Sequence, residues 1–245
     1  MNKQLNVYGI QPVIELIDSE KQIDTIYLQK DINTSWSTKI KFLAREQNLN
    51  LKLVPKYKLN RITKKNHQGI VATTSSITFQ NFENLLSIIF SQGKFPIFLL
   101  LDRVTDVRNF GSICRSAESF GVDGIIIPEK NSAQINEIAM KTSAGALSNL
   151  NICREKNLIK TVKTAKKYGL TIIACSEKSH KNICELNLTK PQIIIIGSEE
   201  NGISQPLLKL AHEQGKIPTK GKTNSLNASV AAGIILFEHN RQVCS

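Results

Sequence analysis

The sequence predicts an α/β protein with two domains, of which the second is built on a parallel sheet. After Pro96, continuous runs of β-branched residues and leucine alternate with helical patterns, which is typical of a parallel sheet covered by helices on both faces. Before residue 75, shorter strands and helices form a small α/β unit, and the polar stretch TTSSITFQN then breaks the pattern. We therefore expect a first domain over 1–75, a linker with a short helix over 76–95, and a second domain over 96–245.

The first domain is predicted to combine two helices with three strands. Apolar residues at helical spacing predict helices over 11–19 and 37–48. Short β-branched runs predict strands over 23–28, 51–54 and 69–74, with a helical turn over 58–63. In the linker, apolar residues at helical spacing predict a helix over 81–91.

The second domain is predicted to repeat strand and helix in a regular order. Its strands are expected at 97–102, 124–128, 171–175, 192–197 and 216–218. Its helices are expected near 109–120, 132–140, 158–168, 205–211 and 226–240. Sheets of this kind bind ligands at the carboxyl ends of their strands, so the loops that follow the strands are the expected site.

The formal net charge of +12 favours a polyanionic partner such as nucleic acid, although a lysine-rich proteome or simple solubility also explains it. No acidic residue occurs between Glu46 and Glu83, where six basic residues fall. This segment is either a solvated surface or an RNA-contacting edge. The residues that we take as candidates for RNA binding are Lys56, Lys58, Arg61, Lys64, Lys65 and His67, with Lys220 and Lys222 in the second domain.

Several common classes of site have little support in the sequence. The five cysteines are widely spaced and never form CxxC, and the four histidines lack ligand spacing, so we expect no disulfide framework, no metal and a reducing cytoplasm. We expect no signal peptide and no membrane span. No GxGxxG follows a strand, no GxSxG occurs, and GKIPTKGKT has five residues where a P-loop needs four between its glycines.

Three loops rich in Gly, Asn and Ser follow the predicted strands instead, and they resemble a known family. NFGSICRSAESFG (109–121), IGSEENGIS (196–204) and IPTKGKTNSLNASVAAG (217–233) are similar, in order and spacing, to motifs 1, 2 and 3 of the SpoU/TrmH branch of SPOUT RNA methyltransferases. KTSAGA (141–146) also fits, and VYGIQPVIEL (7–16) with NHQGIVA (66–72) resembles the L30e-like substrate-binding domain of that branch. The subgroup that it resembles most is RlmB, which methylates a guanosine of 23S rRNA.

The resemblance implies a SPOUT-type sheet with a C-terminal trefoil knot, a feature that topology rules alone would not predict. It also implies S-adenosylmethionine (SAM) as cofactor, a homodimer, and 2′-O-methylation of a ribose in RNA, most simply of 23S rRNA. A tRNA methyltransferase of the same family and a non-catalytic RNA-binding protein that kept the fold are the alternatives.

The resemblance assigns roles to residues that also have ordinary structural explanations. Its catalytic set here is Asn109, Arg115, Glu199, Ser225 and Asn227, and the residues whose backbone lines the SAM pocket are Gly197, Ile217 and Leu226. Without it, Arg115 would be a helix-surface arginine, Asn109 and Ser225 would be helix caps, and Glu199 would be an exposed turn carboxylate. One departure from the family is TKGK (219–222), where a methionine and few charges are usual.

Overall fold

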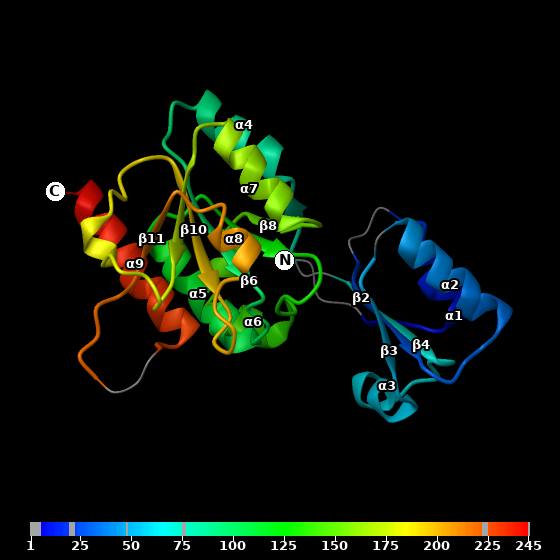
Figure 1. The fold of residues 1–245 in the computed structure, drawn as a ribbon. Coiled ribbons are helices and arrows are strands. Elements are labelled where there is room, and N and C mark those ends of the chain that lie inside the picture. The colour runs from blue at the N-terminus through cyan, green and yellow to red at the C-terminus, as the bar shows by residue number, and fades with distance from the viewer. Residues whose placement is uncertain (1–5, 20–22, 48, 75–76, 222–224, 245) are drawn as a thin grey trace. The chain divides into compact units, whose positions relative to one another are not determined.

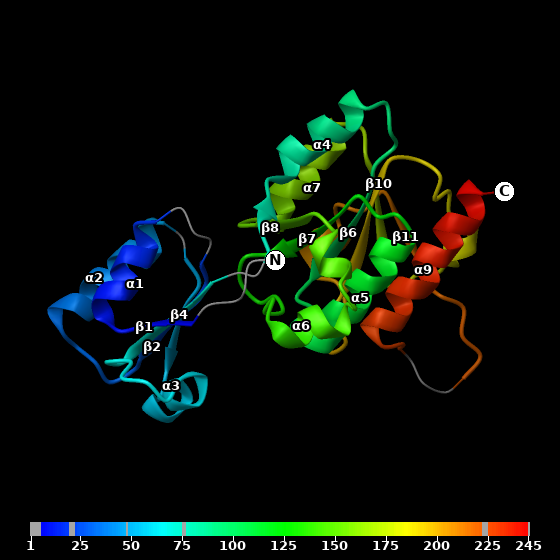
Figure 2. The same ribbon diagram turned by 180° about the vertical axis from the view of Figure 1, so that it is seen from behind.

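A computed structural model describes residues 6–19, 23–47, 49–74, 77–221 and 225–244 of the chain. The chain divides into two compact units, Met1–Thr78 and Phe79–Ser245. Figure 1 and Figure 2 show the elements of each unit from opposite sides. The first unit is an α/β unit of its own, and the second contains the larger sheet.

The first unit is a four-stranded sheet in the order β1-β4-β2-β3 with helices on both faces. Strand β4 is antiparallel to β1 and β2, whereas β2 and β3 are parallel. Helices α1 and α2 share one apolar cluster with the sheet, and α3 contributes Leu59 to a second cluster. The elements are β1 (Asn6–Tyr8), α1 (Ile10–Ile17), β2 (Ile23–Gln29), α2 (Ser35–Glu46), β3 (Leu51–Val54), α3 (Lys56–Ile62) and β4 (Ile70–Thr74).

The second unit confirms the predicted parallel sheet. Its seven strands run parallel in the order β11-β9-β10-β6-β7-β8-β5. The strands are β5 (Phe79–Gln80), β6 (Ile97–Asp102), β7 (Gly124–Pro128), β8 (Ile152–Glu155), β9 (Thr171–Cys175), β10 (Gln192–Gly197) and β11 (Glu213–Gly215). The central strands β6 and β10 are apolar over most of their length because both of their faces are buried.

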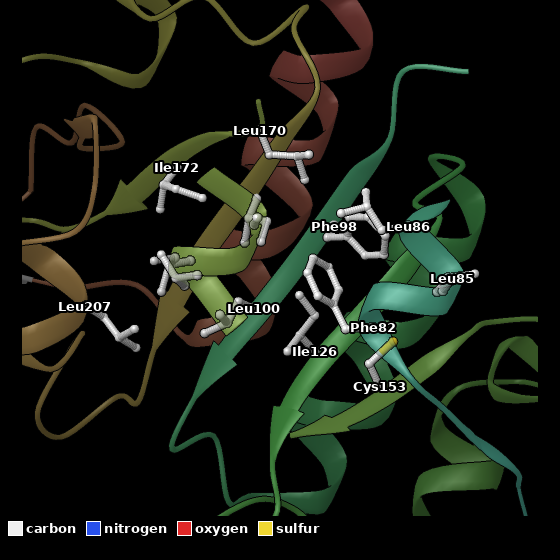
Figure 3. Packing of buried hydrophobic residues seen from close by; sticks show 14 of the residues in the cluster. Phe82, Leu85, Leu86, Phe98, Leu100, Ile126, Cys153, Leu170, Ile172 and Leu207 are labelled. Carbon is white, nitrogen blue, oxygen red and sulfur yellow. The ribbon is translucent and has the colours of Figure 1, made fainter. Parts of the chain in front are cut away.

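Helices cover both faces of this sheet (Figure 1 and Figure 2). They are α4 (Phe82–Ser91), α5 (Val107–Ser119), α6 (Glu137–Thr142), α7 (Leu158–Lys167), α8 (Gln205–Leu208) and α9 (Ala228–Val243), with 3₁₀ turns η1 (Ala146–Ser148) and η2 (Ile183–Glu185). On one face, Phe82 and Leu86 of α4 point toward Phe98 of β6 (Figure 3), and the Phe82 and Phe98 rings meet edge to face with centroids 5.2 Å apart. Helix α5 packs with α6 and α9 on the other side.

Some predicted boundaries are wrong, and each has a local cause. The strand expected at 216–218 is β11, which ends at Gly215; Lys216 instead donates to the Lys181 carbonyl oxygen, and Pro218 has no N–H to donate. The helix expected from residue 132 starts at Glu137, because the Asn136 side chain accepts from two backbone N–H groups and caps it there.

The segment 76–95, expected to be a linker with a short helix, contributes to the second unit. Its residues 79–80 form β5, which pairs with β8, and α4 occupies most of the remainder. Phe82, Leu85 and Leu86 are buried in the main core of that unit (Figure 3). Within the described residues, no helix combines the length and the hydropathy that a membrane crossing requires.

Candidate functional site

The carboxyl ends of β6, β9 and β10 meet at one edge of the second sheet, as parallel pairing requires. The loops that leave this edge include residues 176–182 after β9 and 198–204 after β10. The segment 216–221 and the residues that lead into α9 from Ser225 complete the surroundings. Segments far apart in the sequence therefore enclose one pocket.

This pocket has a volume of about 740 Å³, which is within the usual size of small-molecule sites. All three residues expected to line a cofactor site, Gly197, Ile217 and Leu226, lie in its wall, together with Glu199 and Ser225. The wall carries charges of both signs, from Glu177, Lys178, Glu199, Glu200 and Lys216. Such a wall suits a polar ligand that itself bears opposite charges.

Glu199 is the centre of a hydrogen-bonded cluster at this pocket. Its Oε1 accepts from Asn109 Nδ2 at 3.0 Å and from the Ala228 backbone N–H at 3.3 Å. It also accepts a hydrogen bond from Asn227 Nδ2, and that same nitrogen lies 3.0 Å from Asn109 Oδ1. Asn109, Glu199 and Asn227 are far apart in the sequence, yet the fold brings all three into one cluster. We call these three residues the Glu199 cluster.

The cluster is built on the first turns of two helices. Asp106, not Asn109, caps α5: its carboxylate accepts from the Asn109 backbone N–H at 2.7 Å, which leaves the Asn109 amide free to reach Glu199. Asn227, not Ser225, caps α9, because its Oδ1 accepts from the backbone N–H groups of Ser229 and Val230. One Asn227 amide thus starts a helix with its oxygen and binds Glu199 with its nitrogen.

Two catalytic candidates lie outside the Glu199 cluster: Ser225 lines the pocket, whereas Arg115 does not. Arg115 lies on an exposed part of α5, six residues after Asn109. Over the described part of the chain, no hydrogen bond or ion pair holds its guanidinium. Its planar donors are therefore available to a molecule from outside.

One wall of the pocket comes from residues that the sequence motifs did not predict. Cys175, Glu177, Lys178 and Asn182 line it from the end of β9. Burial, and to a smaller extent the charge of Glu177, raises the pKa of Cys175 to about 12, so its thiol is protonated and inert at neutral pH. The sequence does contain an indication of this wall, since the polar run SEKSHKN directly follows a buried strand, where a ligand-binding loop is expected.

The basic residues of the first unit are mostly exposed around α3. The guanidinium of Arg61 lies 5.7 Å from the centre of the Tyr57 ring, and Lys65 Nζ lies 5.4 Å from that of Tyr8. Lys56, Lys58 and Lys64 are exposed beside them. We call Lys56, Lys58, Arg61, Lys64 and Lys65 the α3 basic surface.

Two other candidates for RNA binding fall outside this surface. His67 is buried; its Nδ1 accepts from the Gly69 N–H at 3.0 Å, and its Nε2 lies 2.8 Å from Asn60 Oδ1. It closes a loop instead of facing solvent, so the expectation that it binds RNA loses its basis. Lys220 is exposed, whereas Lys222 lies outside the described residues. No group of metal-ligating side chains occurs among the residues that the structure describes.

Comparison with known proteins agrees with this geometry. The model of the SpoU rRNA methylase family matches residues 96–237, which is more than half of the chain. The chain belongs to this family. A second model, for the substrate-binding domain of RNA 2′-O ribose methyltransferases, matches residues 6–80. Each of the two units of the chain is therefore matched by a family model of its own.

Curated relatives carry the same general name. A Staphylococcus saprophyticus protein assigned to the TrmH family of tRNA/rRNA methyltransferases is 32% identical over 96% of this chain and 95% of its own length. A Bacillus subtilis protein of that family is 28% identical with the same coverage. A tRNA/rRNA methyltransferase of Synechocystis is 34% identical over 96% of this chain, which spans 62% of that protein's length. None of these names selects the 23S rRNA subgroup that the motifs suggested.

Solved structures show the same fold. The SpoU methyltransferase AviRb from Streptomyces viridochromogenes, solved in complex with the cofactor AdoMet, superposes with a TM-score of 0.61 at 22% identity over 98% of this chain and 90% of its own. A tRNA-modifying TrmH/SpoU enzyme of A. aeolicus superposes with a TM-score of 0.56 at 28% identity over 66% of this chain and 83% of its own. The SPOUT methyltransferase fold expected from the motifs is thereby confirmed, while the trefoil knot stays a prediction.

Proposed function

We propose that the protein is a SAM-dependent methyltransferase that modifies the 2′-oxygen of a ribose in RNA, most simply of a guanosine in 23S rRNA. The observation that carries the proposal is the position of the Glu199 cluster beside a pocket lined by Gly197, Ile217 and Leu226. These are the residues that the motifs of RNA methyltransferases predict, drawn from three separate loops.

The pocket fits SAM in size and in charge. Its mixed wall can accept a ligand that carries an ammonium, a carboxylate and a sulfonium, with carboxylates such as Glu177 and lysines such as Lys216 available to the opposite charges. The backbone of Gly197, Ile217 and Leu226, which line the pocket, can bind the edge of an adenine ring. When bound, SAM supplies a methyl group on a sulfonium, which is a good leaving group.

The chain itself has to bring the 2′-hydroxyl into line with that methyl group. Positioning of this kind supplies much of the acceleration in reactions between two bound molecules. In our proposal the Glu199 cluster holds the start of α9, so that Ser225 and Leu226 keep a fixed place in the pocket wall. Arg115 binds an RNA phosphate and stabilises negative charge on the ribose oxygen, because a guanidinium stays protonated and cannot serve as a general base.

Substitution of Arg115 tests this role. Arg115→Ala should leave SAM affinity nearly unchanged and lower turnover by more than about a hundredfold, as removal of a transition-state donor does in other enzymes. Arg115→Lys keeps the charge without the planar fork, so it should recover only a part of the activity. Unimpaired turnover in Arg115→Ala would remove this residue from the mechanism.

The reaction and its substrate are tested with labelled SAM on deproteinised rRNA and, separately, on tRNA. Label in the ribose of 23S rRNA supports the proposal, and label in tRNA alone supports the alternative within the family. SAM binding without transfer to either RNA would favour a non-catalytic RNA-binding protein. Mapping ribose methylation in cells with and without the protein then identifies the nucleotide.

We propose that the first unit binds RNA through the α3 basic surface. Lysines that neutralise phosphates make binding salt-dependent, and the salt slope falls by roughly 0.7–0.9 for each phosphate that is no longer neutralised. Lys56→Gln with Lys58→Gln should therefore weaken RNA binding and flatten its salt dependence, without effect on SAM. Lys39→Gln with Lys41→Gln on α2 removes the same number of charges and serves as the control. If the two double variants weaken RNA binding equally, the proposal that the α3 basic surface binds RNA specifically is refuted.

We also propose a homodimer that forms in the cytoplasm through α9. Val230, Ile234 and Phe237 lie at helical spacing on α9 and are exposed, Phe237 to 58%, and the exposed Leu226 directly precedes the N-cap of this helix. Such a stripe favours association with a second copy, and Leu226 also lines the pocket. Phe237→Asp should yield monomers in sedimentation analysis; a wild-type protein that is already monomeric at micromolar concentration would exclude this dimer.

A further inference from the structure

Arg103 follows β6 directly and has an unusual backbone conformation. Its φ is 61°, a left-handed value that it shares with only three other non-glycine residues in the part of the chain that the structure describes: Gln68, Asn131 and Ala144. A side chain with a Cβ is disfavoured there, and such a residue persists only where the surroundings impose the conformation. The contacts of Arg103 therefore need an explanation.

Those contacts join β6 to the loop that carries Glu199. The guanidinium of Arg103 pairs with both carboxylate oxygens of Asp102, through Nε at 3.2 Å and Nη2 at 3.3 Å. The same Nη2 donates to the Gly202 carbonyl oxygen at 3.0 Å. Asp102 is only 4% exposed, and its Oδ2 accepts from the Ser204 backbone N–H at 2.6 Å. The adjacent residues Asp102 and Arg103 thus bind one backbone N–H group and one backbone carbonyl oxygen of the segment 202–204.

The 198–204 loop has little freedom once it is held at this end. Its Gly202 N–H donates to the Ser198 carbonyl oxygen at 2.9 Å, so the loop folds back on itself. Glu199 lies inside this turn and accepts from Asn109, Asn227 and Ala228. Residues 197–202 form a continuous part of the pocket wall.

We propose that Asp102 and Arg103 are a positioning pair, which fixes the 198–204 loop and thereby sets the pocket wall and the place of Glu199. Neither residue lines the pocket, so the pair acts through the loop and not by contact with cofactor or RNA. The strained φ of Arg103 is the conformation that lets one guanidinium reach Asp102 and Gly202 together. A change in SAM affinity rests on the proposed function, whereas a change in hydrogen exchange of the loop does not.

Arg103→Gly separates this role from a general contribution to stability. Glycine adopts a positive φ without cost, so the variant relieves backbone strain while it removes the hydrogen bond to Gly202 and the ion pair with Asp102. Because relief of strain and loss of the ion pair oppose each other, we expect a melting temperature close to that of the wild type, an affinity for SAM that is lower by about tenfold or more, and faster hydrogen exchange of the Gly202 and Ser204 amides. Arg103→Lys keeps one donor for Gly202 and should recover a part of the affinity.

Asn131→Gly is the matched control, since Asn131 has a φ of 60° and lies on an exposed loop of the same unit. It should leave SAM affinity and exchange in 198–204 unchanged. Wild-type affinity and exchange in Arg103→Gly would overturn the proposal, and so would a melting temperature lower by several degrees, which would make the pair merely structural. If the wild type itself binds no SAM, the proposed function fails and the exchange result still decides on the pair.

Discussion

Replacement of Gly197 by alanine tests how closely the 198–204 loop packs against the end of β10. A Cβ at this position would lie 2.1 Å from the Gly202 carbonyl carbon, 2.3 Å from the Ile203 nitrogen and 2.5 Å from the Gly202 oxygen. All three atoms belong to the backbone, and the segment that contains them is held by Arg103 at Gly202 and by Asp102 at Ser204. The loop therefore cannot yield by a simple change of rotamer.

The size of the effect follows from this overlap. Non-bonded carbon atoms prefer a separation of about 3.5–4.0 Å, so the loop has to move by more than about 1 Å. Overpacking of this kind costs roughly 1–3 kcal/mol, and rigid backbone neighbours place Gly197→Ala near the upper value of about 3 kcal/mol. For a unit of this size, that corresponds to a fall in melting temperature of roughly 6–12 °C.

Hydrogen exchange measured on peptides of β6 and β10 reports the local stability, and circular dichroism reports melting. The only tryptophan, Trp36, lies in α2 of the first unit, so its fluorescence should not change. Gly233→Ala is the control, because its Cβ would have only an ordinary contact at 3.8 Å, and alanine favours a helix by about 0.5–1 kcal/mol. If Gly197→Ala melts and exchanges like the wild type, the close packing of this loop is refuted.

Three further predictions concern the helix cap, a histidine and the thiols. Asn227→Ala should destabilise α9 by about 1 kcal/mol through loss of the cap, whereas Asn227→Asp keeps the cap but sets a carboxylate against Glu199, so it should melt at a lower temperature and lose methyl transfer in the labelled-SAM assay. His212 Nδ1 accepts a β9 backbone N–H at 2.9 Å, and burial lowers its pKa from 6.5; its stabilisation is thus complete above pH 6.5 and lost as the pH falls, and melting curves at pH 7 and 5 should differ more for the wild type than for His212→Asn. The exposed Cys184 should react with a disulfide reagent in the native protein, whereas Cys114, whose pKa is raised by burial, should react only after unfolding.

The long apolar strands were predictable because burial on both faces leaves a continuous signal in the sequence. IFLLLD and QIIIIG were placed at the bounds that β6 and β10 have in the structure. Strands β1, β5 and β8 were not predicted, because they are short and their conformation depends on a paired neighbour, whereas the equally short β3 was predicted from its apolar run LKLV. Short strands of this kind carry no periodicity of their own.

The candidate site was only partly predictable, for a different reason. Side-chain types alone did not distinguish Asn109 from Asp106 as the cap of α5, because both can accept a backbone N–H. The motifs proposed Glu199, yet its contact with Asn227 depends on how two loops meet in space. Arg103 left no signal in the sequence, since its importance lies in a backbone angle and in a hydrogen bond to a residue almost a hundred positions away.

The start of α9, where a polar run leads into an apolar helix, takes part in the helix cap, the pocket wall and the exposed surface of the helix. Asn227 caps the helix and binds Glu199, so the first turn of α9 cannot shift without a change in the cluster. Leu226 lies in the pocket wall and precedes the helix that carries the exposed residues Val230, Ile234 and Phe237. A second copy of the chain that covers these exposed residues would therefore also contact Leu226 in the pocket wall. Assembly and cofactor binding should then be coupled: if a dimer forms here, its formation and SAM binding should change each other's free energy by the same amount, because both involve the residues at the start of α9.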